Sequence, residues 1–392
     1  MATGRRKHLG ETPRKHRVLV VLGTRPEAIK LAPLIRRLKR NDAFECRVCV
    51  TGQHRSMLGP ILRLFGIVPE HSLDAMRPGQ TLVSLTSRML RGLDRVLEVE
   101  QPQLVIVQGD TTTTLASAVA AFYRHVPIAH VEAGLRTRDL RNPFPEEANR
   151  RLTGSLARWH FAATDSAKEN LLREGVPRRS IAVTGNTVVD AVHGLVERIS
   201  ASPRIERQMR SRMPWLSDLG ATNRKLILVT AHRRESFGAG IEAICMAVRR
   251  IAQRADVEIV WPVHPNPNVC GPVHRLLGNR PRVRLIAAQE YLPFVYLLAK
   301  SCLVLTDSGG IQEEAPSLRK PVLILRSVTE RPEAIDAGVA RLVGTNAKVI
   351  VREVQALLGD AASYLAMTTL RNPFGDGNAS VRIERALLRW LS

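Results

Sequence analysis

The sequence predicts an α/β protein made of two doubly wound, Rossmann-like domains that face each other across a cleft. Short apolar runs alternate with helix-like segments in two blocks, which are separated by a polar stretch at residues 198–225. Candidate polar residues follow the ends of the apolar runs. Such runs are typical of parallel strands buried on both faces, and the alternation is typical of sheets covered by helices.

The length of 392 residues suits two domains of ordinary size. We expect residues 1–16 to form a basic, disordered tail. Residues 17–186 are predicted to form the N-terminal domain and residues 187–371 the C-terminal domain. Residues 372–392 contain a last helix that we expect to return toward the N-terminal domain.

Composition limits the class of protein. Hydrophobic residues make up 44% and charged residues 24%, which allows a large core. Because no apolar run is long enough to cross a membrane and the N-terminus lacks the apolar segment of a secretory signal, we expect a cytoplasmic protein. The five cysteines are scattered and odd in number, so we expect reduced, packed thiols.

The net charge of +22 would suit a partner that is a polyanion. Aromatic residues amount to only 4%, and no basic stretch is interleaved with them. A platform on which bases could stack is therefore missing, and we do not expect a dedicated nucleic-acid function. Most of the charge is interpreted as a solvated, arginine-rich surface.

The first block begins with a predicted strand at residues 17–22, followed by a turn and a helix that ends near Leu38. Pro26 suits the first helical turn, where its missing N–H would have no partner. Arg25 and Lys30 bring two cations to the carboxyl end of this strand, where open α/β sheets bind ligands. For Lys30 taken alone, a solvent-facing helix lysine is the favoured interpretation.

Carboxylates follow two further strands of this block. Residues 104–107 lead to Asp110, and residues 128–131 lead to Glu132, while Glu146 lies near the start of another helix. Carboxylates at neighbouring strand ends are what acid-base chemistry requires. Helix capping, or ion pairs with nearby arginines, would explain each carboxylate singly.

The second block repeats the pattern with histidines. The strand at residues 226–230 precedes His232, and the strand at 259–263 precedes His264. No carboxylate or second histidine stands at a ligand spacing beside them, so we expect no metal site. Downstream of Gln289, Phe294 lies on a predicted helix, where it could pack against a flat ring such as a base.

The stretch at residues 305–314 carries the strongest single signal. It joins a buried strand to a helix through Ser308, Gly309 and Gly310, a turn suited to phosphate. Glu314 lies one helical turn later, where it could accept hydrogen bonds from a ribose. An ordinary turn before an exposed acidic helix would give the same local pattern.

Arg331, which follows the next apolar strand at residues 322–325, can add a fixed positive charge to this turn. Residues 349–358, 363–370 and 379–391 read as the final helices. Together, the turn and the arginine predict a binding site for the diphosphate group of a nucleotide.

These motifs are long and specific, and together they identify a known family. From about residue 18 onward the sequence resembles the non-hydrolysing UDP-N-acetylglucosamine (UDP-GlcNAc) 2-epimerases. The motifs that carry the resemblance are 23–30 (GTRPEAIK), 109–113 (GDTTT), 130–137 (HVEAGLRT), 145–147 (PEE), 232–235 (HRRE), 306–314 (TDSGGIQEE) and 329–333 (TERPE).

The resemblance implies the architecture of B-type glycosyltransferases, a homodimer, and an isomerase that needs neither a nicotinamide nor a metal. It implies reversible conversion of UDP-GlcNAc to UDP-N-acetylmannosamine (UDP-ManNAc) for cell-surface polysaccharide. The family is understood to eliminate UDP across C1 and C2, to keep a glycal bound, and to add UDP back. Carboxylates near C2 and cations at the diphosphate would support that route.

By the same resemblance, site residues can be named by their matching positions. The implied catalytic residues are Asp110, Glu132, Glu146 and His232. The implied nucleotide-binding residues are Arg25, Lys30, Gln289, Phe294, Ser308, Gly309, Gly310, Glu314 and Arg331.

Some bacterial relatives bind a second UDP-GlcNAc as an activator. Such a site is compatible with Gln53, Arg233, Arg234 and His264. Ser56 and Gly79, however, stand where those relatives carry glutamine and arginine, which argues against activation. Other departures from the family pattern are Gln108 in place of histidine, Arg319 in place of glycine and Ser327 in place of an acidic residue.

Two alternatives use the same observations differently. A B-type glycosyltransferase or a hydrolysing 2-epimerase could use the same nucleotide grip, and it would release UDP without an isomeric nucleotide sugar. A basic polyanion-binding protein would bind nucleic acid in a strongly salt-dependent way. Because such a protein has no need of the strand-end carboxylates, the epimerase is the favoured hypothesis.

Overall fold

The structure is a computed structural model that describes residues 15–52 and 55–391. Most of the expected tail and the candidate residue Gln53 therefore lie outside the described residues. The chain divides into two compact units. The first unit consists of Met1–Ala162, Ala167–Ala182 and Ser380–Ser392, and the second of Ala163–Ser166 and Val183–Ala379. The expected domain boundary lay at residue 186.

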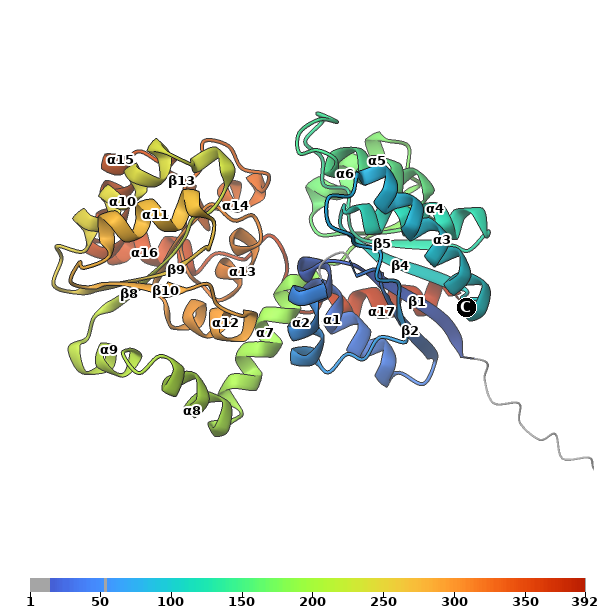
Figure 1. Cartoon of the computed structure of the whole chain (residues 1–392), viewed down its shortest axis with the longest axis horizontal. Coiled ribbons are helices and arrows are strands. Elements are labelled where there is room, and N and C mark those ends of the chain that lie inside the picture. The colour runs from blue at the N-terminus through green and yellow to red at the C-terminus, as the bar shows by residue number, and fades with distance from the viewer. Residues whose placement is uncertain (1–14, 53–54, 392) are drawn as a thin grey trace, which may run out of the picture. The chain divides into compact units, whose positions relative to one another are not determined.

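The first unit is built on a seven-stranded sheet with the order β3-β2-β1-β4-β5-β6-β7 (Figure 1). Adjacent strands from β3 to β6 pair in parallel. The strands are β1 (His16–Leu22), β2 (Phe44–Val50), β3 (His71–Ser72), β4 (Leu104–Gln108), β5 (Ile128–Ala133), β6 (Trp159–Ala162) and β7 (Ile181–Val183).

Seven helices accompany this sheet in the described part of the chain. They are α1 (Arg25–Arg40), α2 (Arg55–Phe65), α3 (Leu82–Glu100), α4 (Thr112–Tyr123), α5 (Glu146–Leu156), α6 (Asp165–Arg173) and α17 (Ala379–Leu391). The start of α1 is fixed by a capping box, in which Thr24 caps the helix and Glu27 hydrogen-bonds back to the Thr24 N–H.

Helix α17 belongs to the first unit although it ends the chain. Glu384 on this helix pairs with the Arg37 guanidinium and accepts a 2.9 Å hydrogen bond from the Asn41 amide, both from α1 and its C-cap. The Trp390 ring stacks on Trp159 and on Phe161, each at a centroid distance of 5.3 Å. Charge pairing at one end and ring stacking at the other therefore attach α17 to the first unit.

The second unit contains a six-stranded parallel sheet with the order β10-β9-β8-β11-β12-β13. This is the doubly wound order 3-2-1-4-5-6, so its topological switch point lies between β8 and β11. The strands are β8 (Lys225–Thr230), β9 (Val257–Val263), β10 (Val283–Ala287), β11 (Leu303–Thr306), β12 (Val322–Ile324) and β13 (Ala340–Leu342).

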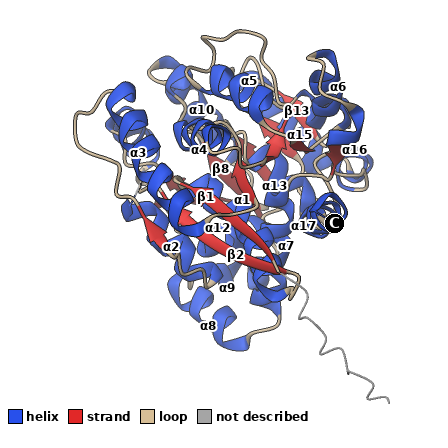
Figure 2. Ribbon diagram, turned by 90° about the vertical axis from the view of Figure 1, so that its right-hand side faces the viewer, coloured by secondary structure: helices blue, strands red, loops and turns tan. Residues whose placement is uncertain are grey.

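Helices alternate with the strands of this sheet as they do in the first unit, and Figure 2 distinguishes the helices of the chain from its strands by colour. Among the described helices, none combines the length and apolar character needed to cross a bilayer. Those of the second unit are α7 (Thr187–Ser200), α8 (Pro203–Arg212), α9 (Leu216–Thr222), α10 (Ala239–Ile251), α11 (Pro267–Leu277), α12 (Tyr291–Lys300), α13 (Ile311–Ser317), α14 (Pro332–Asp336), α15 (Ala347–Gly359) and α16 (Ala361–Thr368).

The stretch between the two predicted blocks is more regular than the sequence indicated. We expected one short helix in residues 198–225, whereas α8 and α9 both form there. In α8 only Met209 is buried, so the helix shows almost no apolar periodicity. Ser202 caps it through a hydrogen bond from the Ile205 N–H, and a proline occupies its first turn. These polar signals, rather than burial, define the helix.

Two buried histidines lie on neighbouring strands of the first sheet. His130 on β5 is paired in register with His160 on β6, and each is only 1% exposed. Burial lowers the pKa of His130 to about 3 and that of His160 to about 4. Both imidazoles are therefore neutral in the folded protein at neutral pH.

A neutral buried histidine makes stability depend on pH. Between pH 6.5 and 4 the unfolded chain binds a proton at His160 that the folded chain does not, so unfolding becomes more favourable as pH falls. We expect His160→Phe to reduce the loss of unfolding free energy between pH 7.5 and 5.5 by about 1 kcal/mol, as measured by urea denaturation. Equal losses in wild type and variant would contradict this assignment.

Candidate functional site

The ends of the central strands locate a candidate site in each unit. In both sheets the strand order reverses once, between β1 and β4 in the first and between β8 and β11 in the second. Ligands of open α/β sheets bind beyond the carboxyl ends of the strands at this point. Asp110 and Glu132 lie at that edge of the first sheet, and His232 and Ser308 at that edge of the second.

The turn between β1 and α1 is organised by the buried carboxylate of Glu27. Its oxygens accept hydrogen bonds from the N–H groups of Gly23 and Thr24, at 2.9 and 2.6 Å, and from the Thr111 hydroxyl at 2.6 Å. Burial raises the pKa of Glu27, and these hydrogen bonds act against that rise. Arg25 opens α1 directly beside this turn, and its guanidinium forms no ion pair with any described residue.

Glu132 is the most constrained of the candidate carboxylates. Both of its oxygens lie 2.7 Å from the Lys30 ammonium, and the Gln108 amide donates a short hydrogen bond to Oε2. The Lys30 side chain is only 13% exposed, so its interpretation as a solvent-facing lysine was wrong. The pairing joins residues from β4, β5 and α1.

The backbone at Glu132 is unusual as well. Its φ is +62°, in the left-handed region, and the register between β5 and β6 shifts between Val131 and Ala133. A residue other than glycine rarely adopts this conformation without support from its surroundings. Such bulges often redirect a side chain next to a functional site. The sequence offered no signal for this bulge.

Asp110 is held through a chain of buried charges. Arg150 on α5 reaches Asp110 Oδ2 from Nη2 at 2.7 Å and from Nε at 2.9 Å. The same guanidinium contacts Glu147 at 3.2 Å, and the Glu147 side chain is fully buried. The Asn149 amide donates to the Asp110 carbonyl at 2.8 Å. Sequence reasoning missed Arg150 and Asn149, although both lie in the helix that the PEE motif begins.

Glu146 is the first residue of α5 and lies next to this network in the sequence. Its Oε2 atom is buried and has no hydrogen-bond partner among the described residues. A buried carboxylate oxygen without a donor is rare in proteins, because the loss of hydration is not compensated. Glu146 is therefore available to a hydrogen-bonding group of a ligand.

The second unit has its own buried carboxylate at the switch point. Asp307, which follows β11, accepts hydrogen bonds from the backbone N–H groups of His232 and Arg233, both at 2.7 Å. Its side chain is fully buried. This contact fixes the turn after β8 to the turn after β11, so the residues named from these two motifs lie together.

His232 is packed between charged and aromatic neighbours. Its Nδ1 lies 3.7 Å from Asp307 Oδ1, and its ring stacks on His264 at a centroid distance of 5.3 Å. Burial lowers the pKa of His232, His264 and Arg233 act in the same direction, and Asp307 opposes them. A neutral imidazole can donate one hydrogen bond and accept another.

The predicted phosphate turn lies beside these residues. The Ser308 N–H already donates to the Thr306 hydroxyl at 3.0 Å, which leaves the glycines as the open part of the turn. A Cβ atom added to Gly309 would lie 3.8 Å from Arg233 Nη2, and one added to Gly310 would lie 3.8 Å from Glu314 Oε1. Arg233 and Glu314 therefore flank the two glycines.

Arg331 is paired with a buried carboxylate, a partner that the sequence did not indicate. It is 8% exposed, and its guanidinium pairs closely with the carboxylate of Glu313, which also accepts from the Asn186 amide. The guanidinium of Arg331 is thus held in place by Glu313. This arginine holds the loop before α14 to α13.

The remaining candidates lie around the same edge of the second sheet. Gln289 follows β10 and donates to the Ala287 carbonyl at 2.7 Å, and Phe294 is half-buried on α12. His264 follows β9 and accepts from the Asn266 N–H at 3.1 Å. Arg234 is exposed in the turn after β8. No group of three or more His, Cys, Asp or Glu residues suited to a metal ion occurs within residues 15–52 and 55–391.

Comparison with known proteins agrees with this geometry. The family model described as UDP-N-acetylglucosamine 2-epimerase matches residues 36–388. A relative from Yersinia pestis named UDP-N-acetylglucosamine 2-epimerase is 55% identical over 372 residues, which cover 95% of this chain and 98% of the relative.

Solved structures give the same result. The crystal structure of UDP-GlcNAc 2-epimerase from Neisseria meningitidis bound to UDP-GlcNAc has a TM-score of 0.88 and 48% identity, covering 95% of this chain and all of that one. A glycosyltransferase from Rickettsia africae is 14% identical with a TM-score of 0.59, over 95% of this chain and 98% of that one, a likeness of fold alone.

The predicted architecture of B-type glycosyltransferases is confirmed. The family model covers most of the sequence, and the curated relative is more than half identical along nearly the whole length of both chains. This chain therefore belongs to the UDP-N-acetylglucosamine 2-epimerase family of enzymes.

Proposed function

We propose that this enzyme interconverts UDP-GlcNAc and UDP-ManNAc by eliminating UDP across C1 and C2 and adding it back to a bound glycal. The observation that carries the proposal is the set of carboxylates in the first unit. Asp110 is held by Arg150, Glu132 is held by Lys30, and Glu146 has a buried oxygen without a donor. Removing and returning a proton at a sugar carbon needs carboxylates in fixed positions.

In this mechanism the two units have different tasks. The carboxylates of the first unit carry the proton at C2. The turn formed by Ser308, Gly309 and Gly310 holds the diphosphate of the departing UDP, and His232 donates a hydrogen bond to it as a neutral imidazole. Arg25 and Arg233 supply positive charge, since neither guanidinium forms an ion pair with a described residue. Glu314 binds the ribose, and Phe294 packs against the uracil.

The proposal extends to assembly, location and pathway. It includes a homodimer, a cytoplasmic enzyme and a supply of ManNAc-type precursors for cell-surface polysaccharide. Exposed apolar side chains on helices of the first unit, among them Val83, Phe122 and Leu152, support an interface between copies. All five cysteines are free thiols, which is the usual state in a reducing compartment.

The reaction can be tested by isotope incorporation. When purified protein is incubated with UDP-GlcNAc in heavy water, we expect UDP-ManNAc that carries deuterium at C2, detected by NMR. The deuterium arrives because the proton lost in the elimination exchanges with solvent before it is replaced. An unlabelled epimer would exclude the proposed elimination route. Free UDP with a released or transferred sugar would favour the hydrolysing enzyme or the glycosyltransferase instead.

Asp110 can be tested by an isosteric change. We expect Asp110→Asn to lower kcat by about 10²-fold to 10⁴-fold, because the amide cannot take up a proton. The affinity for UDP, measured by calorimetry, should stay within about threefold of wild type, a change below 1 kcal/mol, because the proposed UDP contacts lie mainly in the second unit. Near-normal turnover would remove Asp110 from the catalytic residues.

Arg150 is proposed as a positioning residue for Asp110. Removing it alone would leave the buried Glu147 charge without its ion pair, a loss of about 3–5 kcal/mol of stability. We therefore compare Glu147→Gln with the double variant Glu147→Gln/Arg150→Met. We expect both to fold, and the double variant to show a kcat at least about tenfold lower with little change in KM.

A merely structural role for Arg150 predicts another result. In that case kcat in the double variant would equal that of Glu147→Gln, and only the melting temperature would differ. Arg150→Lys gives a further control, since one ammonium can reach Asp110 but cannot reproduce the two-pronged contact. Its kcat should lie between those of wild type and the double variant.

A further inference from the structure

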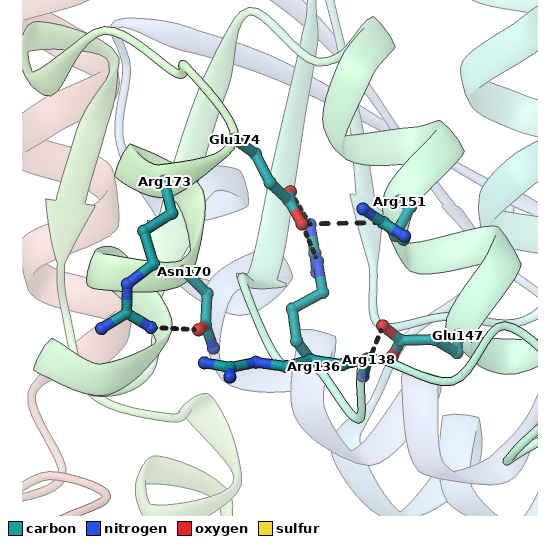
Figure 3. A pocket seen from close by; sticks show the side chains of 7 residues that line it. All are labelled: Arg136, Arg138, Glu147, Arg151, Asn170, Arg173 and Glu174. Atoms are coloured by element: carbon teal, nitrogen blue, oxygen red, sulfur yellow. Dashed lines mark hydrogen bonds and ion pairs between the residues drawn. The ribbon is translucent and has the colours of Figure 1, made fainter.

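A pocket with an unusual lining lies in the first unit and shares only Glu147 with the network around Asp110. Its volume is about 580 Å³, and its walls come from the loop after β5, from α5 and from the end of α6 (Figure 3). No aromatic or aliphatic side chain lines it. The lining residues are Arg136, Arg138, Glu147, Arg151, Asn170, Arg173 and Glu174.

The carboxylates of the pocket are already engaged. Glu147 is fully buried and accepts hydrogen bonds from the Thr137 and Arg138 N–H groups and from Arg150. Glu174 accepts a two-pronged contact from Arg136, with distances of 2.7 Å from Nε and 2.6 Å from Nη2. Of the other arginines of the pocket, only Arg151 lies within ion-pair distance of one of these carboxylates, Glu174.

Three guanidinium groups keep most of their donors. Arg138 has no ion pair among the described residues. Arg173 only reaches the Asn170 amide oxygen, at 3.4 Å, and Arg151 lies 3.7 Å from Glu174, beyond hydrogen-bond distance. The four arginines and two carboxylates that line the pocket leave it with a net charge of +2. Arginine side chains that converge repel one another and do little to stabilise the fold. Their convergence therefore indicates a site for an anion.

The walls of the pocket are held in place by backbone contacts. Gly134 lets the loop after β5 approach α6 closely, since a Cβ atom there would lie 2.2 Å from the Ala167 carbonyl oxygen. Arg138 has a φ of +69°, a strained conformation for this residue, and its N–H is fixed by Glu147 at 3.3 Å. Figure 3 shows Arg138 extending toward Asn170, on the same side as Arg173.

We propose that this pocket binds a small phosphate anion that carries several negative charges. A phosphoryl group presents several oxygens in different directions, so it can accept from Arg138, Arg151 and Arg173, which approach from three separate elements. A planar carboxylate matches a single guanidinium, as Glu174 matches Arg136. The lining contains no aromatic side chain that could hold a nucleotide base between rings, so the anion itself is the group that the pocket suits.

This site does not depend on the proposed reaction. None of its seven lining residues is among the proposed substrate-binding residues, so a protein without epimerase activity should still bind the anion. The pocket does share Glu147 with the Glu147–Arg150–Asp110 chain. An anion bound in the pocket would therefore lie beside Glu147, which contacts Arg150, the residue that positions Asp110.

The test is a calorimetric titration of the full chain with inorganic pyrophosphate. UDP is kept at a saturating concentration, so that the proposed diphosphate site is filled. EDTA removes metal ions, and a constant ionic strength keeps the screening of charges the same throughout the titration. We expect one pyrophosphate per chain. The double variant Arg138→Gln/Arg173→Gln should bind at least about tenfold more weakly, since each arginine contributes a charge-assisted hydrogen bond.

Two controls decide the interpretation. Arg207→Gln/Arg204→Gln removes the same charge from exposed positions of α8 and should bind pyrophosphate as the wild type does. Citrate, titrated at a pH that matches the charge of the two anions, should bind more weakly than pyrophosphate. Absence of binding to the UDP-saturated wild type, unchanged affinity in the Arg138/Arg173 variant, or citrate binding as tight as pyrophosphate would each overturn the proposal.

If UDP itself fails to bind, the proposed function fails, and the titration is repeated without it. The Arg138→Gln/Arg173→Gln variant should then still lose one pyrophosphate site that the α8 variant keeps. Both arginines are exposed, so we expect the melting temperature of the variant to match that of the wild type. The two proposals can therefore fail separately.

Discussion

Buried carboxylates are the constraint on which the strand-end loops of this enzyme depend. A charged carboxylate removed from water must be compensated by donors nearby, or its burial costs several kcal/mol. In the first unit Glu27 and Glu147 meet this requirement with N–H donors of nearby loops, and Glu132 meets it with the ammonium of Lys30 on α1. In the second unit Asp307 and Glu313 do the same. Each carboxylate therefore connects segments of the chain that the sheet hydrogen bonds alone would leave independent.

This requirement explains how irregular segments can hold a site with the precision that catalysis needs. The loop after β5 is fixed at Thr137 and Arg138 because both N–H groups donate to Glu147, which α5 supplies. The same helix supplies Arg150 to Asp110 after β4. Two loops and one helix are thus coupled by a single chain of charges. Loss of one member would leave a buried charge unpaired, so the network resists gradual loosening.

The sequence predicted the fold well because parallel strands are apolar on both faces and their order is limited by short connections. It also predicted that Asp110, His232 and Ser308 would follow strands, since position along the chain decides that, whereas Glu132, expected just after a strand, lies inside β5. It could not predict side-chain partners. Lys30 pairs with Glu132 across 102 residues of sequence, and that contact depends on a bulge and a left-handed φ that no local pattern encodes. The sequence likewise did not predict the ion pair between Arg331 and Glu313.

The compensation of Asp110 and Glu132 in the first unit differs from that of Asp307 in the second, and this difference separates the chemistry of the two candidate sites. In the first unit the cations Lys30 and Arg150 are used by carboxylates, so they position acid-base groups and add little net charge for an anionic ligand. In the second unit Asp307 is satisfied largely by backbone N–H groups. The Arg233 guanidinium therefore stays beside the Gly309 turn without a carboxylate partner among the described residues. Because backbone N–H groups satisfy Asp307, the arginine side chain beside it remains available to the diphosphate. In the first unit, by contrast, the side chains of Lys30 and Arg150 orient carboxylates for proton transfer.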